Sequence, residues 1–255
     1  MALIKNPEDL RKLRQSGKRL SAVLRAVVKE VKPGVSAKYL DDLAERLIRE
    51  GGDEPAFLNY RPRGASRPYP ATLNVSINDE VVHGIPNEKE KILKDGDIVL
   101  LDTGLYHEGI YTDMAVTVPV GNADKEALRL IEITKNALMA GIKAAVMGGR
   151  INDIGCAMEP VVRKAGFSIV PELCGHGVGY AQHEAPEVPS FCMKGKSPAL
   201  KDGMVIAIEP IVNEGGPHIY LMDDGYTYKT ADGKRSAEFE HTILITENGP
   251  EIITA

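Results

Sequence analysis

Two stretches of the sequence share the tetrapeptide Leu-Lys-Asp-Gly, and each continues as an apolar run that ends in an acid. Residues 93–102 read LKDGDIVLLD and end at Asp102, whereas residues 200–209 read LKDGMVIAIE and end at Glu209. The Lys-Asp-Gly triplet is typical of a turn, and the apolar runs have the composition of buried strands. A carboxylate that ends a buried strand is costly unless a cation or several hydrogen bonds compensate it. The pair therefore indicates one site shared by two halves of the chain.

The residues around these stretches also match in order. Each half carries a histidine next to a glycine before the shared stretch, and a second acid opens an apolar run after it. The spacings differ between the halves, so the match is one of order and not of strict period. If the halves pack about a pseudo-twofold axis, six side chains converge at its centre. They are His83, Asp102 and Asp113 from the first half, and His176, Glu209 and Glu240 from the second.

Four carboxylates at one centre predict a divalent metal site. Without a cation they would repel one another, and some would have to stay protonated. In two-metal hydrolytic sites, carboxylates can bridge ions that lie about 3.5–4 Å apart. Oxygen and imidazole ligands without a thiolate favour Mn²⁺, Fe²⁺, Co²⁺ or Zn²⁺ in a catalytic role over a structural zinc site. A water shared by two such ions would be a hydroxide near neutral pH, which predicts hydrolysis of an amide.

Hydrophobic periodicity predicts the elements that carry these residues. A long helix and a shorter helix come first, followed by a loop rich in proline and arginine over residues 55–70 and then by a strand-rich region. A second helix pair and a second strand-rich region follow. This order predicts an α+β fold, with an antiparallel sheet and both helix pairs on one face. The predicted helices run from Pro7 to before Pro33, from Ser36 to Gly51, and over about 123–147 and 152–165; the strand-rich regions are 71–118 and 168–254.

The composition is that of an ordinary globular chain. It has 255 residues, of which 43% are hydrophobic and 26% charged, enough to bury a sizeable core. The interlocked repeat favours a single catalytic domain over residues 1–255, with half-repeats at about 1–120 and 121–255. The net charge of −5 argues against binding to nucleic acid or to an anionic membrane. No apolar run approaches the ~18 residues of a transmembrane helix.

The cysteines and the start of the sequence bear on location. Cys156, Cys174 and Cys192 form no Cys-x-x-Cys pair, and any disulfide scheme leaves one of them unpaired. The sequence MALIKNPEDL lacks the basic-then-apolar pattern of a secretory signal. We therefore expect a reducing, cytoplasmic location.

Five motifs taken together resemble one family, although each alone would be weak evidence. The chain resembles the type I methionine aminopeptidases, within a larger metallopeptidase group that also holds Xaa-Pro aminopeptidases and prolidases. The resemblance runs from about Ile4 to Thr254, nearly the whole chain. The motifs are SINDEVVHGIP (76–86), the Asp102 and Asp113 pair, CGHGVGYAQHEAPEVP (174–189), AIEP (207–210) and EFEHT (238–242).

The resemblance implies a pita-bread fold with a dinuclear metal centre. In the family pattern, Asp113 and Glu240 would bridge both ions, Asp102 would chelate one of them, and His176 with Glu209 would hold the other. Glu209 would also shuttle the proton of the attacking water. The residues implied to contact the substrate are His83 and His183 near the scissile peptide, and Tyr69, Asn74 and Tyr226 near the pocket for methionine.

The implied activity is removal of the N-terminal methionine from nascent proteins and peptides with a small second residue. A hydroxide bound to two divalent ions (Co, Mn, Fe or Zn) would attack the peptide. The expected partner is a peptide or nascent-chain N-terminus, with neither nucleic acid nor membrane. We expect a monomer that contacts the ribosome at most transiently.

Three residues depart from the family pattern, and none of them is one of the five implied ligands. Gln182 stands where many relatives carry an apolar or aromatic residue, Asn74 where a cysteine is common, and Tyr226 where a tryptophan is frequent. The loop before Tyr69 is also longer than in the shortest bacterial members. These departures predict a pocket of altered shape and substrate preference.

Two other functions remain open at this point. An Xaa-Pro aminopeptidase or prolidase would share the fold, but those enzymes usually carry an Arg-Ile-Glu-Asp-type segment where this chain has Glu238-Phe-Glu-His241, and a large extra N-terminal domain. A non-catalytic binding protein on the fold would typically have lost metal ligands. The remaining histidines, His107, His218 and His241, are expected to be structural, and Cys174 is expected to pack rather than react.

Overall fold

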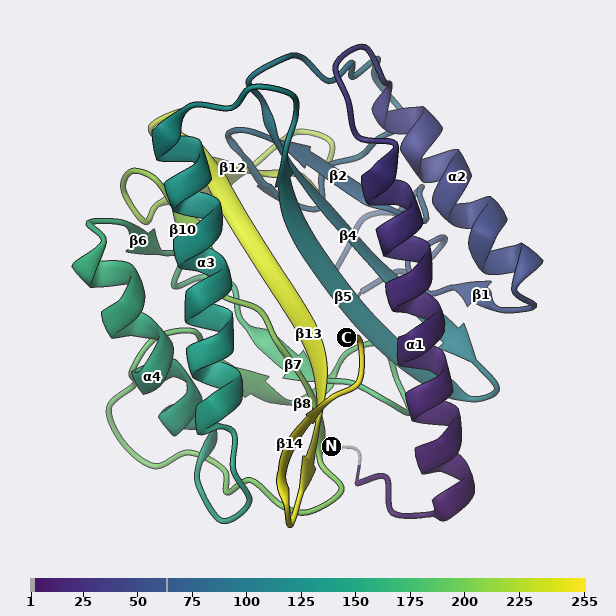
Figure 1. The fold of residues 1–255 in the computed structure, drawn as a ribbon, viewed down its shortest axis with the longest axis vertical. Helices are drawn as coiled ribbons and strands as arrows, with labels where there is room; N and C mark the ends of the chain where they lie inside the picture. Colours follow the sequence, from purple (N-terminus) through teal and green to yellow (C-terminus); the bar gives the residue numbers. More distant parts are fainter. Residues whose placement is uncertain (1–2, 63) are drawn as a thin grey trace.

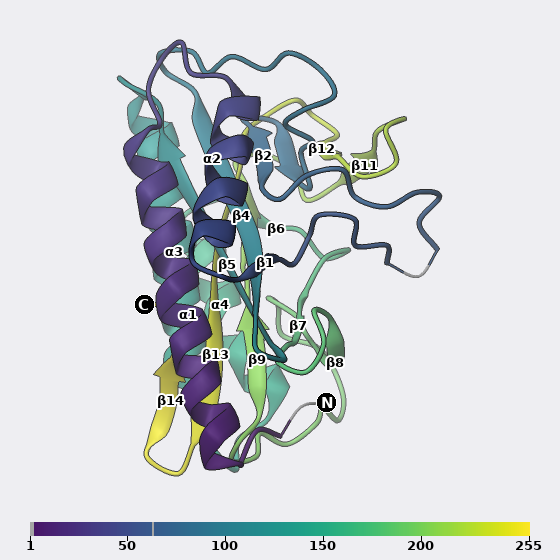
Figure 2. The same cartoon turned by 90° about the vertical axis from the view of Figure 1, so that its right-hand side faces the viewer.

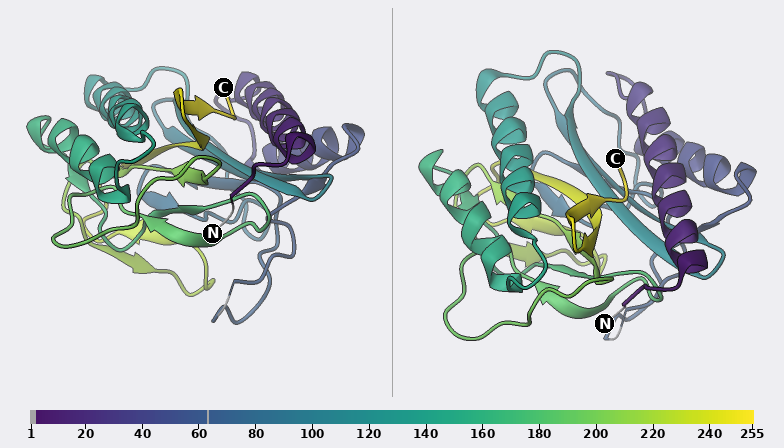
Figure 3. Two further views of the ribbon diagram at one scale, coloured as in Figure 1. Left: turned by 90° about the horizontal axis from the view of Figure 1, so that it is seen from below. Right: turned by 60° about the horizontal axis from the view of Figure 1, so that its bottom comes forward.

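The computed structural model describes residues 3–62 and 64–255. Four helices lie along one side of a large antiparallel sheet, as the view from below shows most directly (Figure 3). The predicted α+β class with two helix pairs on one face is therefore confirmed. The helices are α1 (Pro7–Lys29), α2 (Ala37–Glu50), α3 (Lys125–Ala144) and α4 (Ile151–Lys164), and Figure 1 shows the pairs on either side of the central strands.

Local capping explains where the helices begin. The side chain of Asn6 accepts a hydrogen bond from Glu8 N at 2.9 Å at the start of α1, and Ser36 caps α2 through Tyr39 N at 3.1 Å. Asp124 caps α3 through Ala127 N at 2.8 Å, so this helix begins two residues later than predicted. These side chains satisfy backbone donors that have no partner within the helix.

The strands form an eleven-stranded sheet and a small three-stranded sheet. The longest path through the large sheet has the order β1-β4-β5-β13-β9-β7-β8, and the small sheet has the order β11-β12-β3. The strands are β1 (Glu54–Pro55), β2 (Asn74–Ile77), β3 (Glu80–Val82), β4 (Ile98–His107), β5 (Ile110–Pro119), β6 (Ser168–Ile169), β7 (Gly175–Gly177), β8 (Glu184–Val188), β9 (Val205–Ile208), β10 (Ile211–Asn213), β11 (Ile219–Leu221), β12 (Tyr228–Thr230), β13 (Ser236–Thr246) and β14 (Gly249–Ile252).

The central strand β13 joins the two halves of the sheet. It pairs with β5 on one side, where Glu240 lies opposite Ala115, and with β9 on the other, where Thr242 lies opposite Ala207. The apolar run that ends at Asp102 lies in β4, and the run that Asp113 opens lies in β5; these two ten-residue strands form one long hairpin. Both strands extend beyond the runs because backbone pairing continues as far as His107 and Ile110.

Alternation along the strands divides the sheet into two faces. Successive side chains of a strand point to opposite faces, so Leu101 and Asp102 face opposite ways. Leu101 packs in a buried cluster with residues of α1 and α2, and Ile243 packs in a second cluster with residues of α3 and α4. Asp102 and Glu240 therefore face away from the helices. Figure 2 shows that the long loops and the small sheet lie on this opposite side.

Two of the three cysteines are paired in the structure. Cys156 of α4 and Cys192, in the segment after β8, form a disulfide across 36 residues of sequence, and Cys174 remains free. Sequence spacing gave no sign of this pair because the contact is tertiary. Glu159 of α4 accepts a hydrogen bond from Cys192 N, which holds the segment along the helix. The cysteines therefore give no support to a reducing environment.

Within the described residues, none of the helices combines the length and the apolar character that crossing a bilayer requires.

Candidate metal centre

A cavity of about 500 Å³ lies on the face of the sheet opposite the helices. It is lined by acids, histidines and aromatic rings from both halves of the chain. None of the lining residues that the structure describes is lysine or arginine. The polar and aromatic lining residues include Tyr60, Tyr69, Asn74, His83, Asp102, Asp113, His176, His183, Glu209, Tyr226, Glu238 and Glu240.

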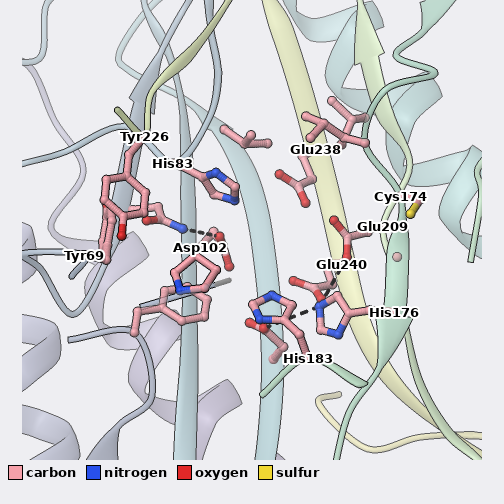
Figure 4. A pocket seen from close by; sticks show the side chains of 18 of the residues that line it. Tyr69, His83, Asp102, Cys174, His176, His183, Glu209, Tyr226, Glu238 and Glu240 are labelled. Carbon is pink, nitrogen blue, oxygen red and sulfur yellow. Dashed lines mark hydrogen bonds and ion pairs between the residues drawn. The ribbon is translucent and has the colours of Figure 1, made fainter. Parts of the chain in front are cut away.

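The five predicted metal ligands converge in this cavity. Figure 4 labels four of them, Asp102, His176, Glu209 and Glu240. The ligand atoms of the five form overlapping groups in which all atoms lie within 4.8 Å of one another, and a further group includes His183. Asp113, His176 and Glu240 each belong to two of these groups. Of these three, only the carboxylates of Asp113 and Glu240 have two oxygens with which to serve two ions at once. The groups are Asp102, Asp113 and Glu240; His176, Glu209 and Glu240; and Asp113, His176 and His183.

Strand register explains why these acids meet. Asp102 lies opposite Ala115 in the β4–β5 hairpin, and Glu240 of β13 lies opposite the same alanine. Residues directly opposite in an antiparallel ladder share a face, so the two carboxylates project into the same space. Thr242 strengthens the join, because its hydroxyl accepts from Asp113 N and donates to Asp113 O, both at 2.9 Å.

The buried carboxylates lack compensation from the protein. Burial raises the pKa of Asp102 to about 7, although the hydrogen bond from Asn74 acts to lower it. Burial, followed by the charge of neighbouring acids, raises the pKa of Asp113, Glu209 and Glu240 well above the usual range. Asp102 Oδ1 and Glu240 Oε1 are buried without a hydrogen-bond partner among the described residues. Divalent cations would supply the missing partners, so the donor set fits a metal centre.

His176 presents one ring nitrogen to the acids. Its Nδ1 lies 2.8 Å from Gly177 O, so this nitrogen carries the proton and donates to the carbonyl. Its Nε2 lies 3.5 Å from Glu209 Oε1 and 3.9 Å from Asp113 Oδ2. Burial lowers the pKa of the ring, which favours the neutral form. A neutral imidazole oriented by a backbone carbonyl is the usual form of a metal-binding histidine.

His183 and His83 face the cavity from two sides. The His183 ring centroid lies 4.3 Å from that of His176, and its Nδ1 lies 3.1 Å from the Tyr60 hydroxyl. Burial lowers the pKa of His183 to about 3, with smaller effects from His176 and His83, and burial lowers the pKa of His83 to about 4. His83 has a left-handed backbone with φ +56°. Both rings are therefore neutral near pH 7.

The three residues predicted near the substrate pocket all line the cavity, but Asn74 also has a different contact. Tyr69 and Tyr226 form an edge-to-face pair with centroids 5.1 Å apart. Their hydroxyls donate to Gly84 O and Arg67 O, so the rings present apolar faces to the cavity. Asn74 instead donates from Nδ2 to Asp102 Oδ2 at 2.5 Å.

A fifth buried acid, Glu238, is a site residue that sequence reasoning missed. The residue is 2% exposed, and its side chain lies beside Glu209 in the lining of the cavity (Figure 4). Its Oε2 has no partner among the described residues. The two-residue period of β13 could have revealed it, because Glu238 and Glu240 must share a face.

Tyr60 was also missed, since it lies in a loop where no periodicity predicts the direction of a side chain.

Cys174 lines the cavity as a free thiol. Burial raises the pKa of the thiol and the charge of Glu187 raises it further, so the thiol stays protonated near neutral pH. This agrees with the interpretation of Cys174 as a packing residue.

Comparison with known proteins agrees with this geometry. The model of metallopeptidase family M24 matches residues 11–247. The chain belongs to this family. It is 42% identical to a methionine aminopeptidase of Clostridium perfringens, covering 100% of this chain and 99% of that protein, and 41% identical over the same shares to methionine aminopeptidase 1 of Bacillus subtilis. It is therefore a metallo-aminopeptidase of the methionine aminopeptidase branch of family M24.

Solved structures confirm the pita-bread fold. A methionine aminopeptidase of Thermotoga maritima matches with a TM-score of 0.93 at 39% identity, covering 100% of this chain and 99% of that one. A prolidase of Pyrococcus furiosus matches with a TM-score of 0.77 at 22% identity, and this chain covers 66% of it. The second likeness shows the shared fold alone.

The raised pKa values of the buried acids predict how the stability of the metal-free protein depends on pH. Their folded pKa values lie above the unfolded values, so the folded state binds more protons, and its stability falls as pH rises from about 4 through 7. We expect the melting temperature measured with a chelator to decrease over this range, and added Mn²⁺ to remove the decrease. Asp102→Asn should flatten the metal-free profile. The prediction is contradicted if, with a chelator present, the melting temperature of the wild type rises with pH and that of Asp102→Asn rises to the same extent.

Proposed function

We propose that the protein removes the N-terminal methionine from peptides and nascent chains whose second residue is small, using two divalent metal ions. The observation that carries the proposal is the overlap of the ligand groups at Asp113 and Glu240. Such an overlap supports two cation positions that share these carboxylates. The methionine aminopeptidases that match over the full chain support the choice of substrate.

The proposed ligands divide between the two cation positions. Asp102 would serve one ion and His176 with Glu209 the other, while Asp113 and Glu240 serve both. When bound, the ions supply Lewis-acid activation of water and of the peptide carbonyl. Mn²⁺, Fe²⁺, Co²⁺ and Zn²⁺ all suit this oxygen and imidazole set.

The protein's own groups orient the substrate and move protons. With Nδ1 of His183 facing the Tyr60 hydroxyl, its Nε2–H is available to donate to the carbonyl oxygen as that oxygen gains charge. His83 faces the same space and contacts the nitrogen of the scissile peptide. Glu209 accepts a proton from the attacking water and passes it to the leaving amine. The neutral state of both rings suits groups that donate hydrogen bonds without adding charge.

The rings of Tyr69 and Tyr226 form an aromatic wall of the cavity, and this wall receives the methionine side chain. Tyr69 and Tyr226 have their hydroxyls engaged by backbone carbonyls, so their rings offer an apolar surface beside Asp102. Thioethers pack well against aromatic rings. The amine of the substrate would then lie beside the metal ligands, which explains the restriction to chain ends.

We further infer the wider setting from family membership. The whole chain, residues 1–255, would act as a single catalytic domain with half-repeats at about 1–120 and 121–255. It would work as a monomer in the cytoplasm on emerging chains, with at most a transient ribosome contact.

A substrate panel tests the reaction. Because the pocket wall is apolar and the amine would reach the metal ligands, Met-Ala-Ser should be hydrolysed to methionine and Ala-Ser in the presence of Mn²⁺ or Co²⁺. Ala-Pro peptides should remain intact, because no proline-specific activity is proposed. Faster cleavage of Ala-Pro, or no cleavage of methionyl peptides with any of the four metals, would refute the proposal.

Loss of a shared ligand should affect both ions. Asp113→Ala and Glu240→Ala should each reduce activity to background and reduce metal content by more than one equivalent, measured by elemental analysis after anaerobic purification. Asp42→Ala, an exposed substitution on α2, serves as the control and should retain both ions. Full metal occupancy in Asp113→Ala would show that Asp113 is not a ligand.

His183 should act on the substrate and not on the metal. Donors aimed at a developing oxyanion are worth about 10²–10³ in kcat, so His183→Ala should turn over more slowly by this factor with its metal content unchanged. His83→Ala should behave similarly, with a higher KM. The exposed His218→Ala is the matched control. Since His183 also lies within reach of Asp113 and His176, loss of one equivalent of metal in His183→Ala would make it a ligand instead.

A further inference from the structure

We propose that Asn74 and Gln182 are positioning residues that orient the two aspartate ligands, Asp102 and Asp113, through neutral carboxamide donors. The inference rests on the proposed function, because it takes both aspartates as metal ligands. It also gives a role to two positions, 74 and 182, at which the sequence departs from the pattern of the methionine aminopeptidase family.

Asn74 is placed against Asp102 by strand pairing. The two residues lie directly opposite each other in the β2–β4 ladder and so project to the same face. Asn74 is 3% exposed, and its Nδ2 donates to Asp102 Oδ2 at 2.5 Å. The other carboxylate oxygen, Oδ1, has no partner among the described residues. The contact therefore holds one oxygen of Asp102 and leaves the other for a cation.

Gln182 reaches Asp113 through space that a glycine leaves open. Its Nε2 lies 3.5 Å from Asp113 Oδ2, at the long end of hydrogen bonding. Gly104 lies directly opposite Asp113 in the β4–β5 hairpin, where a side chain would share the face of the carboxylate. A Cβ at residue 104 would lie 3.1 Å from Gln182 Nε2 and 3.0 Å from a ring carbon of Phe57. The absence of a side chain at this position is what admits the amide.

Asp113 is held at both oxygens as a result. Met114 N donates to Oδ1 at 3.0 Å, and Gln182 approaches Oδ2. Gln182 is 4% exposed, and its Oε1 has no hydrogen-bond partner among the described residues. Burying an amide with an unpaired carbonyl is unfavourable. Contact with Asp113 is the polar interaction that the structure shows for this side chain.

A carboxamide suits this position because it donates without carrying charge. A lysine or arginine would neutralise the aspartate and compete with the cation, whereas an amide N–H orients the carboxylate and leaves its charge for the metal. Partners that hold ligands in this way typically contribute about 10–100-fold to metal affinity. We expect the larger effect from Asn74, whose contact is shorter.

Metal titration of the chelator-treated protein tests the inference. Asn74→Leu keeps a branched side chain of similar size, and Gln182→Met keeps an unbranched one, while both remove the donor. Calorimetric titration with Mn²⁺ should show about 10–100-fold weaker binding in Asn74→Leu and a smaller loss in Gln182→Met. The absorption spectrum of bound Co²⁺ should also change, because a freed carboxylate alters the ligand geometry. Affinities within twofold of the wild type in both variants, with unchanged Co²⁺ spectra, would overturn the inference.

The chain provides a matched control for the loss of an amide donor. Asn87 donates to the buried carboxylate of Asp41 at 3.3 Å and to Pro70 O at 2.9 Å, and none of these three residues lines the cavity. Asn87→Leu should lower the melting temperature and leave Mn²⁺ affinity unchanged. An equal loss of affinity in this control would show that the effect is general destabilisation and would also overturn the inference.

Three further variants keep the test decisive. If Asn74→Leu does not fold, Asn74→Ala removes the donor with a smaller side chain and should weaken Mn²⁺ binding similarly. Gly104→Ala should displace Gln182 and reproduce the Gln182→Met affinity. Wild type and Asp102→Ala, titrated alongside, test the ligand assignment by itself. Tight binding in the wild type that is lost in Asp102→Ala, together with unaffected amide variants, would reject the positioning role and leave the proposed function intact.

Discussion

Negative charge buried where the two halves of the chain meet is the constraint on which the rest of the structure depends. Asp102, Asp113, Glu209, Glu238 and Glu240 surround one cavity, and none of its described lining residues is lysine or arginine. Burial raises the pKa of all five carboxyl groups, and the charge of neighbouring acids raises it further in all of them except Asp102. Protons can relieve this charge in the metal-free protein, but divalent cations relieve it while also supplying chemistry. The same electrostatic imbalance that makes the site costly to fold thus defines what it binds.

The sheet holds these charges together against their repulsion. The strand β13 pairs with β5 and with β9, so it joins the acid-bearing hairpin of one half to the strand that leads into Glu209 in the other. The Thr242 hydroxyl strengthens this join at Asp113, since it accepts a hydrogen bond from Asp113 N and donates one to Asp113 O. On the opposite face, Leu101 and Ile243 belong to the buried clusters under the two helix pairs. Apolar burial on one face therefore stabilises a strained concentration of charge on the other.

The polar residues around the proposed ligands divide into those that contact carboxylates and those whose polar atoms face elsewhere. Asn74 and Gln182 turn toward carboxylates, whereas Tyr69 and Tyr226 direct their hydroxyls to backbone carbonyls and leave their rings to the cavity. His176 is oriented by the carbonyl of Gly177, and His183 by the hydroxyl of Tyr60. Each ring thereby has a defined nitrogen available, which allows two neighbouring histidines to act on different partners.

Local information in the sequence determined the helices, the strand-rich regions and the acids that end the two matching stretches. Caps such as Asn6 and Ser36 and a two-residue alternation act over short distances, so they can be read directly. Glu238 was predictable on the same grounds, because it shares a face with Glu240. Tertiary structure alone decided the Cys156–Cys192 disulfide, the contact of Asn74 with Asp102 and the approach of Gln182 past Gly104. Each of these depends on segments far apart in sequence meeting at a distance of a few ångströms, which no local pattern encodes.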